Sequence, residues 1–174
     1  MRDIVPVELT TFLGSSETIV SLSREIPKKD SQDRLEVLIE IVSLTVLNVA
    51  NPYYKKFDIP VGPVLFNFLL EPLKNANYYS ESDKDILFGI MMSKNGLVAS
   101  YNDGGPYFHR TDVKYCYEHK ILHQDKSQST INGIGYGRGT KILYEIADII
   151  FVDTINGTLY TGISVDNQFF KSRV

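Results

Sequence analysis

The sequence is poor in cysteine and in long apolar runs, the features that stabilise proteins in oxidising compartments and anchor them in membranes. Cys116 is its single cysteine, so it has no disulfide framework and no cysteine-based zinc cluster. No run approaches the roughly 18 consecutive apolar residues of a membrane span. The apolar stretch near the N-terminus is too short for a signal peptide. We therefore expect a soluble, cytoplasmic protein.

An excess of charge of one sign is also missing. The net charge of −3 gives no general attraction to nucleic acid or to an anionic membrane, and we expect neither as a partner. The hydrophobic share of 43% and the charged share of 22% are typical of a globular domain. The length of 174 residues predicts one domain, residues 1–174, with a sizeable core.

The histidines do not make a convincing metal site. His109, His119 and His123 lie in one short stretch, and the last two are spaced to share a helical face. No carboxylate is well placed to complete a site with them, and Cys116 is a poor substitute. These histidines could also be considered as phosphoacceptors, but a kinase that phosphorylates itself carries that histidine on a separate helix. Residues 31–50, which we expect to form such a helix, contain no histidine, so we do not expect a self-phosphorylating sensor kinase.

Apolar periodicity predicts three main helices, over residues 31–50, 61–79 and 140–148. In each of them apolar residues recur at helical spacing and form a face for the core. We expect a shorter helix over residues 112–120. Pro72 lies inside the second helix and should remove one hydrogen bond, at a cost of about 3 kcal/mol in a free helix.

Short runs of β-forming residues predict the strands, which are residues 4–9, 18–23, 86–92, 97–101, 149–153 and 159–165. Asn-Gly pairs at 95–96 and 156–157 are typical of tight hairpins. Residues 107–132 are the least regular part. A segment of that length without clear structure is typical of a lid or of a disordered region.

The helix over residues 61–79 carries polar residues on an otherwise apolar background. Asn67, Glu71 and Asn75 recur every four residues and so stack on one helical face. The simplest interpretation is a solvated face. A polar stripe beside Pro72 also fits a helix that builds a site.

A glycine-rich run, residues 133–140, directly precedes the last predicted helix. Its alternating glycines let a ligand approach the backbone closely, and a helix start offers unpaired N–H groups to phosphate. The run lacks the Gly-Lys-Ser/Thr of a P-loop and the Gly-x-Gly-x-x-Gly spacing of a dinucleotide site. Taken alone, the glycine run fits two interpretations, a phosphate-binding loop and a flexible hinge.

Taken in order, these motifs resemble those of the GHKL ATPase superfamily, the histidine kinase-like ATPases. Glu71-Pro72-Leu73-Lys74-Asn75-Ala76 is similar to the Glu-x-x-x-Asn-Ala box, and Asp103-x-Gly105 to the start of the Asp-x-Gly-x-Gly box. Gly135-x-Gly137-x-Gly139 looks like the third box, and Gly157-Thr158-Leu159-Tyr160 is similar to the closing strand. The resemblance covers about residues 31–165.

The resemblance implies a fold, a ligand and roles for the matched residues. The fold is an α/β (α+β) two-layer sandwich, with a mixed, mainly antiparallel sheet and helices on one face. The ligands are ATP or ADP and Mg²⁺. Glu71 would be the catalytic base, Asn75 the Mg²⁺ ligand and Asp103 the acceptor for the adenine amino group. The other nucleotide-binding residues would be Tyr79, Gly105, Gly135, Gly137, Arg138, Gly139, Thr140 and Thr158, under a lid of residues 106–132.

Within the superfamily, residues 137–148 are similar to the Gly-Arg-Gly…Ala-Asp stretch of the anti-sigma-factor serine/threonine kinases. This implies a small protein kinase that phosphorylates a partner protein, and leaves a homodimer open. Tyr107 replaces the second glycine of its box, and Tyr78 stands where a basic residue is common. These departures keep three alternatives open: the ATP-binding domain of a histidine kinase system, a non-hydrolysing adenine-nucleotide-binding regulatory module, and a purely structural interaction domain.

Overall fold

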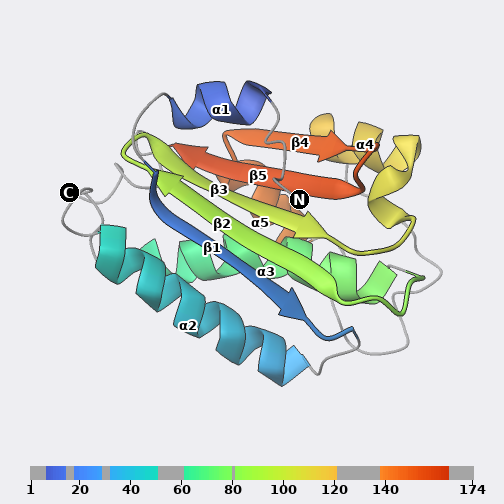
Figure 1. The fold of residues 1–174 in the computed structure, drawn as a ribbon, viewed down its shortest axis with the longest axis horizontal. Helices are drawn as coiled ribbons and strands as arrows, with labels where there is room; N and C mark the ends of the chain where they lie inside the picture. The colour runs from blue at the N-terminus through green and yellow to red at the C-terminus, as the bar shows by residue number, and fades with distance from the viewer. Residues whose placement is uncertain are drawn as a thin grey trace.

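A five-stranded sheet forms the middle of the structure (Figure 1). The computed structural model describes residues 7–14, 18–28, 32–50, 61–79, 81–120 and 138–164. The strands, in spatial order, are β1 (Thr18–Ile26), β2 (Ile86–Ser93), β3 (Gly96–Asn102), β5 (Thr158–Ser164) and β4 (Ile149–Asp153). Every neighbouring pair is antiparallel. Tight turns join β2 to β3 and β4 to β5, as the two Asn-Gly pairs predict.

Three helices cover one face of this sheet, namely α2 (Gln32–Ala50), α3 (Val61–Tyr79) and α5 (Arg138–Ile146). Near the ends of β3 and β4 lie a short 3-10 turn, η1 (Tyr107–His109), and helix α4 (Thr111–Glu118). The α/β two-layer sandwich is confirmed. The sheet is antiparallel throughout the described strands, where the sequence predicted a mixed one. None of the described helices is long and apolar enough to cross a membrane.

Helix α1 (Val7–Leu13) corrects the prediction of a strand over residues 4–9. Leu9 and Leu13, one turn apart, pack with Val98 on the face of the sheet opposite α3. A helix therefore covers part of the second face as well, whereas helices were expected on one face only. The β-branched Ile4, Val5 and Val7 favoured a strand, and a short apolar run does not distinguish the two periodicities. Residues 4–6 lie outside the described residues.

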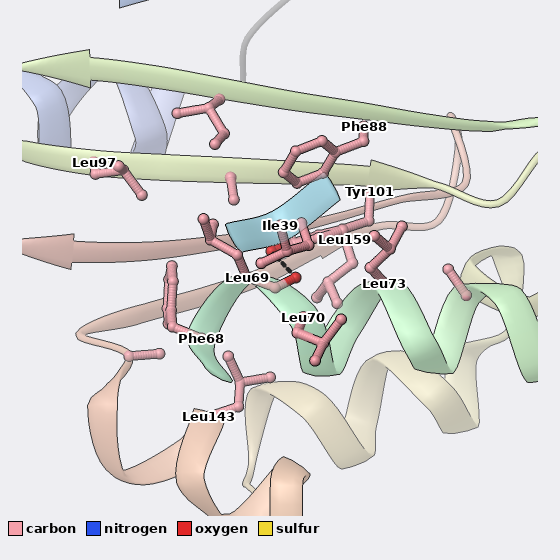
Figure 2. Packing of buried hydrophobic residues seen from close by; sticks show 14 of the residues in the cluster. Ile39, Phe68, Leu69, Leu70, Leu73, Phe88, Leu97, Tyr101, Leu143 and Leu159 are labelled. Atoms are coloured by element: carbon pink, nitrogen blue, oxygen red, sulfur yellow. Dashed lines mark hydrogen bonds between the residues drawn. The ribbon is translucent and has the colours of Figure 1, made fainter. Parts of the chain in front are cut away.

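Helix α3 is the central element of the core (Figure 2). Phe68, Leu69 and Leu70 are consecutive, yet each is at most 1% exposed. A helix that buries three successive side chains is covered on several sides. Here the sheet, α2 and α5 supply the cover, with Phe88, Ile39 and Leu143 among the contacting side chains.

Pro72 sits within α3 and has no N–H to offer the carbonyl of Phe68. At the next position, the hydroxyl of Tyr101 on β3 donates a hydrogen bond to the carbonyl oxygen of Leu69, at 3.2 Å (Figure 2). Burial raises the pKa of Tyr101, which keeps the phenol protonated and able to donate. The sheet thus holds the helix at the turn where the proline interrupts the hydrogen-bond ladder.

Replacing Tyr101 by Phe should lower the free energy of unfolding by about 1 kcal/mol, because one buried hydrogen bond is lost and the ring is kept. Urea denaturation followed by far-UV circular dichroism measures this. The control is Tyr115→Phe, at an exposed tyrosine of α4, which should change stability by less than about 0.5 kcal/mol. Equal effects of the two variants would contradict a role for the Tyr101 bond.

Candidate functional site

The two polar residues of the first motif lie one turn apart on α3 but have different neighbours. The amide nitrogen Nδ2 of Asn75 donates a hydrogen bond to the hydroxyl of Tyr117 on α4, at 2.9 Å. The carboxylate of Glu71 lies 3.8 Å from Nζ of Lys74, which is itself 3.6 Å from Oε1 of Glu36 on α2. Asn75 therefore faces α4, and the ionic contacts of Glu71 lead toward α2.

Burial raises the pKa of Glu71 above its ordinary value. The Lys74 ammonium works in the opposite direction, and the Glu36 carboxylate adds to the rise. A carboxyl group whose pKa is raised toward neutrality is suited to accept a proton as a general base. Buried ion pairs that serve only the fold raise the pKa of a carboxyl group in the same way. Glu71 therefore acts as a base only where a group with a transferable proton lies beside it.

Asp103, the acceptor expected for adenine, directly follows β3 and is 0% exposed. Strand alternation places it on the same face as Tyr101, which contacts α3. The turn behind it is tightly built, because Oδ1 of Asn102 accepts a hydrogen bond from the N–H of Gly104, at 2.9 Å. Burying a carboxylate is costly, and a surface turn would not require it.

Gly104 is required by this turn. Its φ of +64° is a conformation that residues with a side chain rarely adopt, and an added Cβ would lie 2.7 Å from Cβ of Lys84. Gly105, the position matched to the second motif, is not among the glycines with positive φ. The glycine of the motif and the glycine that the backbone needs are therefore different residues.

The closing-strand motif lies beside Asp103. Asn102 is paired with Thr158 across β3 and β5, and its Nδ2 donates to Oγ1 of Thr158, at 3.1 Å. The same nitrogen lies 2.7 Å from the carbonyl oxygen of Asn156. Thr158 is buried. Two motifs that are more than fifty residues apart in the sequence are thus joined through one asparagine side chain.

An aromatic cluster connects α3 to η1 and α4. Tyr79 stacks on Tyr107, with ring centroids 5.7 Å apart. Tyr107 packs against Phe108, and Phe108 packs against Tyr117. Tyr117 in turn meets Tyr144 of α5 edge-on. The first part of the expected lid, through Lys120, is therefore folded against the motif-bearing helix; residues 121–132 lie outside the described residues.

The third motif is described only in part. Gly135 and Gly137 lie outside the described residues, whereas Arg138, Gly139 and Thr140 form the first turn of α5. Helix α5 packs against α3. At its other end, Nζ of Lys120 donates to the carbonyl oxygens of Tyr144 and Ala147, at 2.7 and 3.2 Å. Helix α5 is thus held with its C-terminus capped.

Sequence analysis missed three contributors to this region. Tyr117 was not singled out, and Tyr107 was noted only as a departure from glycine. Lys28 was not singled out either, and its Nζ donates to the carbonyl oxygen of Ala76 in the last turn of α3, at 2.7 Å. The density of aromatic residues over 107–117 is the only sequence signal for the first two.

No metal site made of protein ligands alone is present among the described residues, since no group of three His, Cys, Asp or Glu side chains is close enough. His109 and His119 contact the carbonyl oxygens of Thr154 and Tyr115, and His123 lies outside the described residues. Asn75 fits the different arrangement that Mg²⁺ commonly uses, in which one or two protein oxygens combine with nucleotide phosphates and water.

Comparisons with protein-family models, with curated proteins and with solved structures found no match for this chain.

Replacing Gly104 by Ala should lower the free energy of unfolding by about 1–3 kcal/mol, the usual cost of a positive φ at a residue with a side chain. Gly105→Ala is the matched control and should cost less than about 1 kcal/mol. Thermal denaturation of both variants measures the difference. A Gly104→Ala protein as stable as wild type would show that the turn can relax.

Replacing Glu71 by Gln should raise the free energy of unfolding, relative to wild type, by more at pH 7 than at pH 4. The folded-state pKa of Glu71 is raised, so ionisation destabilises the fold as pH rises from the ordinary value through the folded value. Glutamine cannot ionise and escapes this penalty. The difference in unfolding free energy between variant and wild type should therefore grow with pH.

Urea denaturation at several pH values between 4 and 8 tests the Glu71 prediction. The control is Glu40→Gln, at an exposed position of α2. It should change the free energy of unfolding by less than about 0.5 kcal/mol at every pH. A Glu71→Gln difference that is independent of pH would contradict the raised pKa.

Proposed function

We propose that this chain is an ATP- and Mg²⁺-binding protein of the histidine kinase-like ATPase superfamily, and that it acts as a small protein kinase of the anti-sigma-factor type. The observation that carries the proposal is the fully buried carboxyl of Asp103, which directly follows Asn102, the residue whose side chain bonds Thr158. A carboxylate held inside the fold just after a strand can accept a strong hydrogen bond from the amino group of a ligand that reaches it.

Adenine is the donor that fits this acceptor. Its exocyclic amino group would donate to Asp103, and a hydrogen bond to a charged acceptor contributes roughly 1.5–3 kcal/mol. Guanine carries a carbonyl oxygen at the corresponding ring position, so the same carboxylate would repel it. The phosphates would then lie toward the start of α5, because the N-terminus of a helix favours anions.

The remaining motif residues divide the other tasks. Asn75 would hold Mg²⁺, which supplies charge neutralisation for the phosphates when bound. In the kinase reaction the hydroxyl oxygen of the partner's serine or threonine bonds to the terminal phosphorus of ATP, the bond to the bridging oxygen breaks, and ADP leaves. Glu71, with its raised pKa, would accept the hydroxyl proton.

A second candidate is a non-hydrolysing module that binds adenine nucleotide and regulates a partner. The placement of Glu71 favours it, because its ionic contacts are with Lys74 and, through Lys74, with Glu36 of α2. A carboxylate held in this way is not free to receive a proton until those contacts rearrange. The two candidates share the nucleotide site and differ in turnover.

Thermal shift with ATP, ADP and GTP, with and without Mg²⁺, tests nucleotide binding. ATP at about one hundred times its dissociation constant should stabilise the protein by about 2.7 kcal/mol, and GTP at the same concentration should give a clearly smaller shift. In Asp103→Asn the preference for ATP over GTP should be lost. The exposed Asp112 supplies the control, and Asp112→Asn should keep the preference.

Absence of any shift with ATP would refute the proposed site. A preserved ATP preference in Asp103→Asn would refute the adenine assignment alone. Transfer of labelled phosphate to a candidate partner then separates kinase from regulator, and Glu71→Gln should abolish transfer while retaining ATP binding. A phosphorylated product that is stable in acid indicates serine or threonine, whereas an acid-labile product indicates a histidine kinase system.

A further inference from the structure

The hydrogen bond between Asn75 and Tyr117 joins the expected Mg²⁺ ligand to the first helix of the lid region. The two residues are 42 positions apart, and Tyr117 is only 4% exposed. A buried hydroxyl that bonds a side-chain amide on another helix is a specific pairing, and the matched family motifs do not include a residue at this position.

The direction of this bond determines which end of the amide remains available. A carboxamide carries its donor nitrogen and its acceptor oxygen on opposite sides of one carbon. Because Nδ2 of Asn75 donates to the Tyr117 hydroxyl, Oδ1 is directed away from that ring. Oxygen is the atom that Mg²⁺ requires, and it is the end of the side chain that this bond does not use.

Tyr117 is itself held in place by its neighbours. Its ring packs against Phe108, which packs against Tyr107, and the Tyr107 ring stacks on Tyr79 of α3. Three aromatic residues of the lid region and two residues of α3 therefore form one connected set of contacts. Tyr107, which stands where the motif has a glycine, therefore helps to hold Asn75 through these contacts.

Helix α4 has other attachments that do not involve this hydroxyl. The hydroxyl of Tyr144 donates to the carbonyl oxygen of Cys116, at 3.3 Å. Oε1 of Glu118 accepts a hydrogen bond from the N–H of Val152 on β4, at 3.2 Å. Removing the Tyr117 hydroxyl should therefore leave α4 docked, and its effect should be confined to Asn75.

We propose that Tyr117 is a positioning residue that holds the Asn75 side chain with Oδ1 presented to the Mg²⁺ of a bound nucleotide. The inference rests on the proposed function and adds to it a residue from outside the matched motifs. It makes binding of the metal depend on the docking of α4, so the lid region and the metal ligand act as one unit.

The test is calorimetric titration of ATP into wild type and Tyr117→Phe, in excess Mg²⁺ and in EDTA. Wild type should bind ATP more tightly with Mg²⁺ than without it. Tyr117→Phe should lose roughly tenfold of that Mg²⁺-dependent gain, the usual effect of removing a residue that orients a metal ligand. Its affinity for ATP in EDTA should stay within about twofold of wild type.

Tyr115→Phe is the matched control, since it removes another tyrosine hydroxyl of α4, at an exposed position. It should keep the Mg²⁺-dependent gain. In an Asn75→Ala background, Tyr117→Phe should have no further effect on that gain, because the group it positions is gone.

Each failure points to a different conclusion. Tyr117→Phe with a full Mg²⁺-dependent gain would overturn the inference and leave nucleotide binding intact. Equal losses in Mg²⁺ and in EDTA would overturn it as well, since the hydroxyl would then act on the nucleotide or on the fold. Failure of wild type to bind ATP under either condition would instead refute the proposed function.

Discussion

Burial of α3 between the sheet, α2 and α5 is the constraint on which the other features depend. Phe68, Leu69 and Leu70 occupy consecutive positions and all point into apolar surroundings, so the helix cannot rotate without exposing a large side chain. The hydrogen bond from Tyr101 to Leu69 holds the helix at the turn weakened by Pro72. With its rotation and depth set in this way, the polar residues of the following turn have defined directions.

The polar groups of the candidate site lie where this packing ends. Asp103 is buried at the end of β3, and Glu71 is partly desolvated on α3. Taking a carboxyl group out of water costs stability unless its partners offset that cost. Natural proteins accept such local costs mainly at functional positions, where charge and geometry are maintained at the expense of stability. The burial of these two carboxyl groups, more than the motif letters, is the physical support for the proposed site.

Most of the fold could be predicted from the sequence, because long elements with clear periodicity form where local preference and burial agree. The helices over 32–50 and 61–79 and the two Asn-Gly hairpins are examples. The candidate site was predicted from the sequence as a set of residues, and their arrangement was not. Spacing puts Glu71 and Asn75 on one helical face, yet Lys74 draws the first toward α2 and Tyr117 engages the second from α4. Tyr107 looked like a substituted glycine, and its ring stacks on Tyr79.

By itself the sequence determined the order of the elements, the ends of most of them and the motif residues that each carries, since these depend on contacts within a few positions along the chain. Only the tertiary structure decided that residues 7–13 form a helix on the second face of the sheet, that the strand order is β1-β2-β3-β5-β4, and that the Asn102 side chain bonds both Gly104 and Thr158. These depend on which distant surfaces bury each other. Local periodicity carries no information about that choice, because the same apolar stripe can pack against any partner of matching shape.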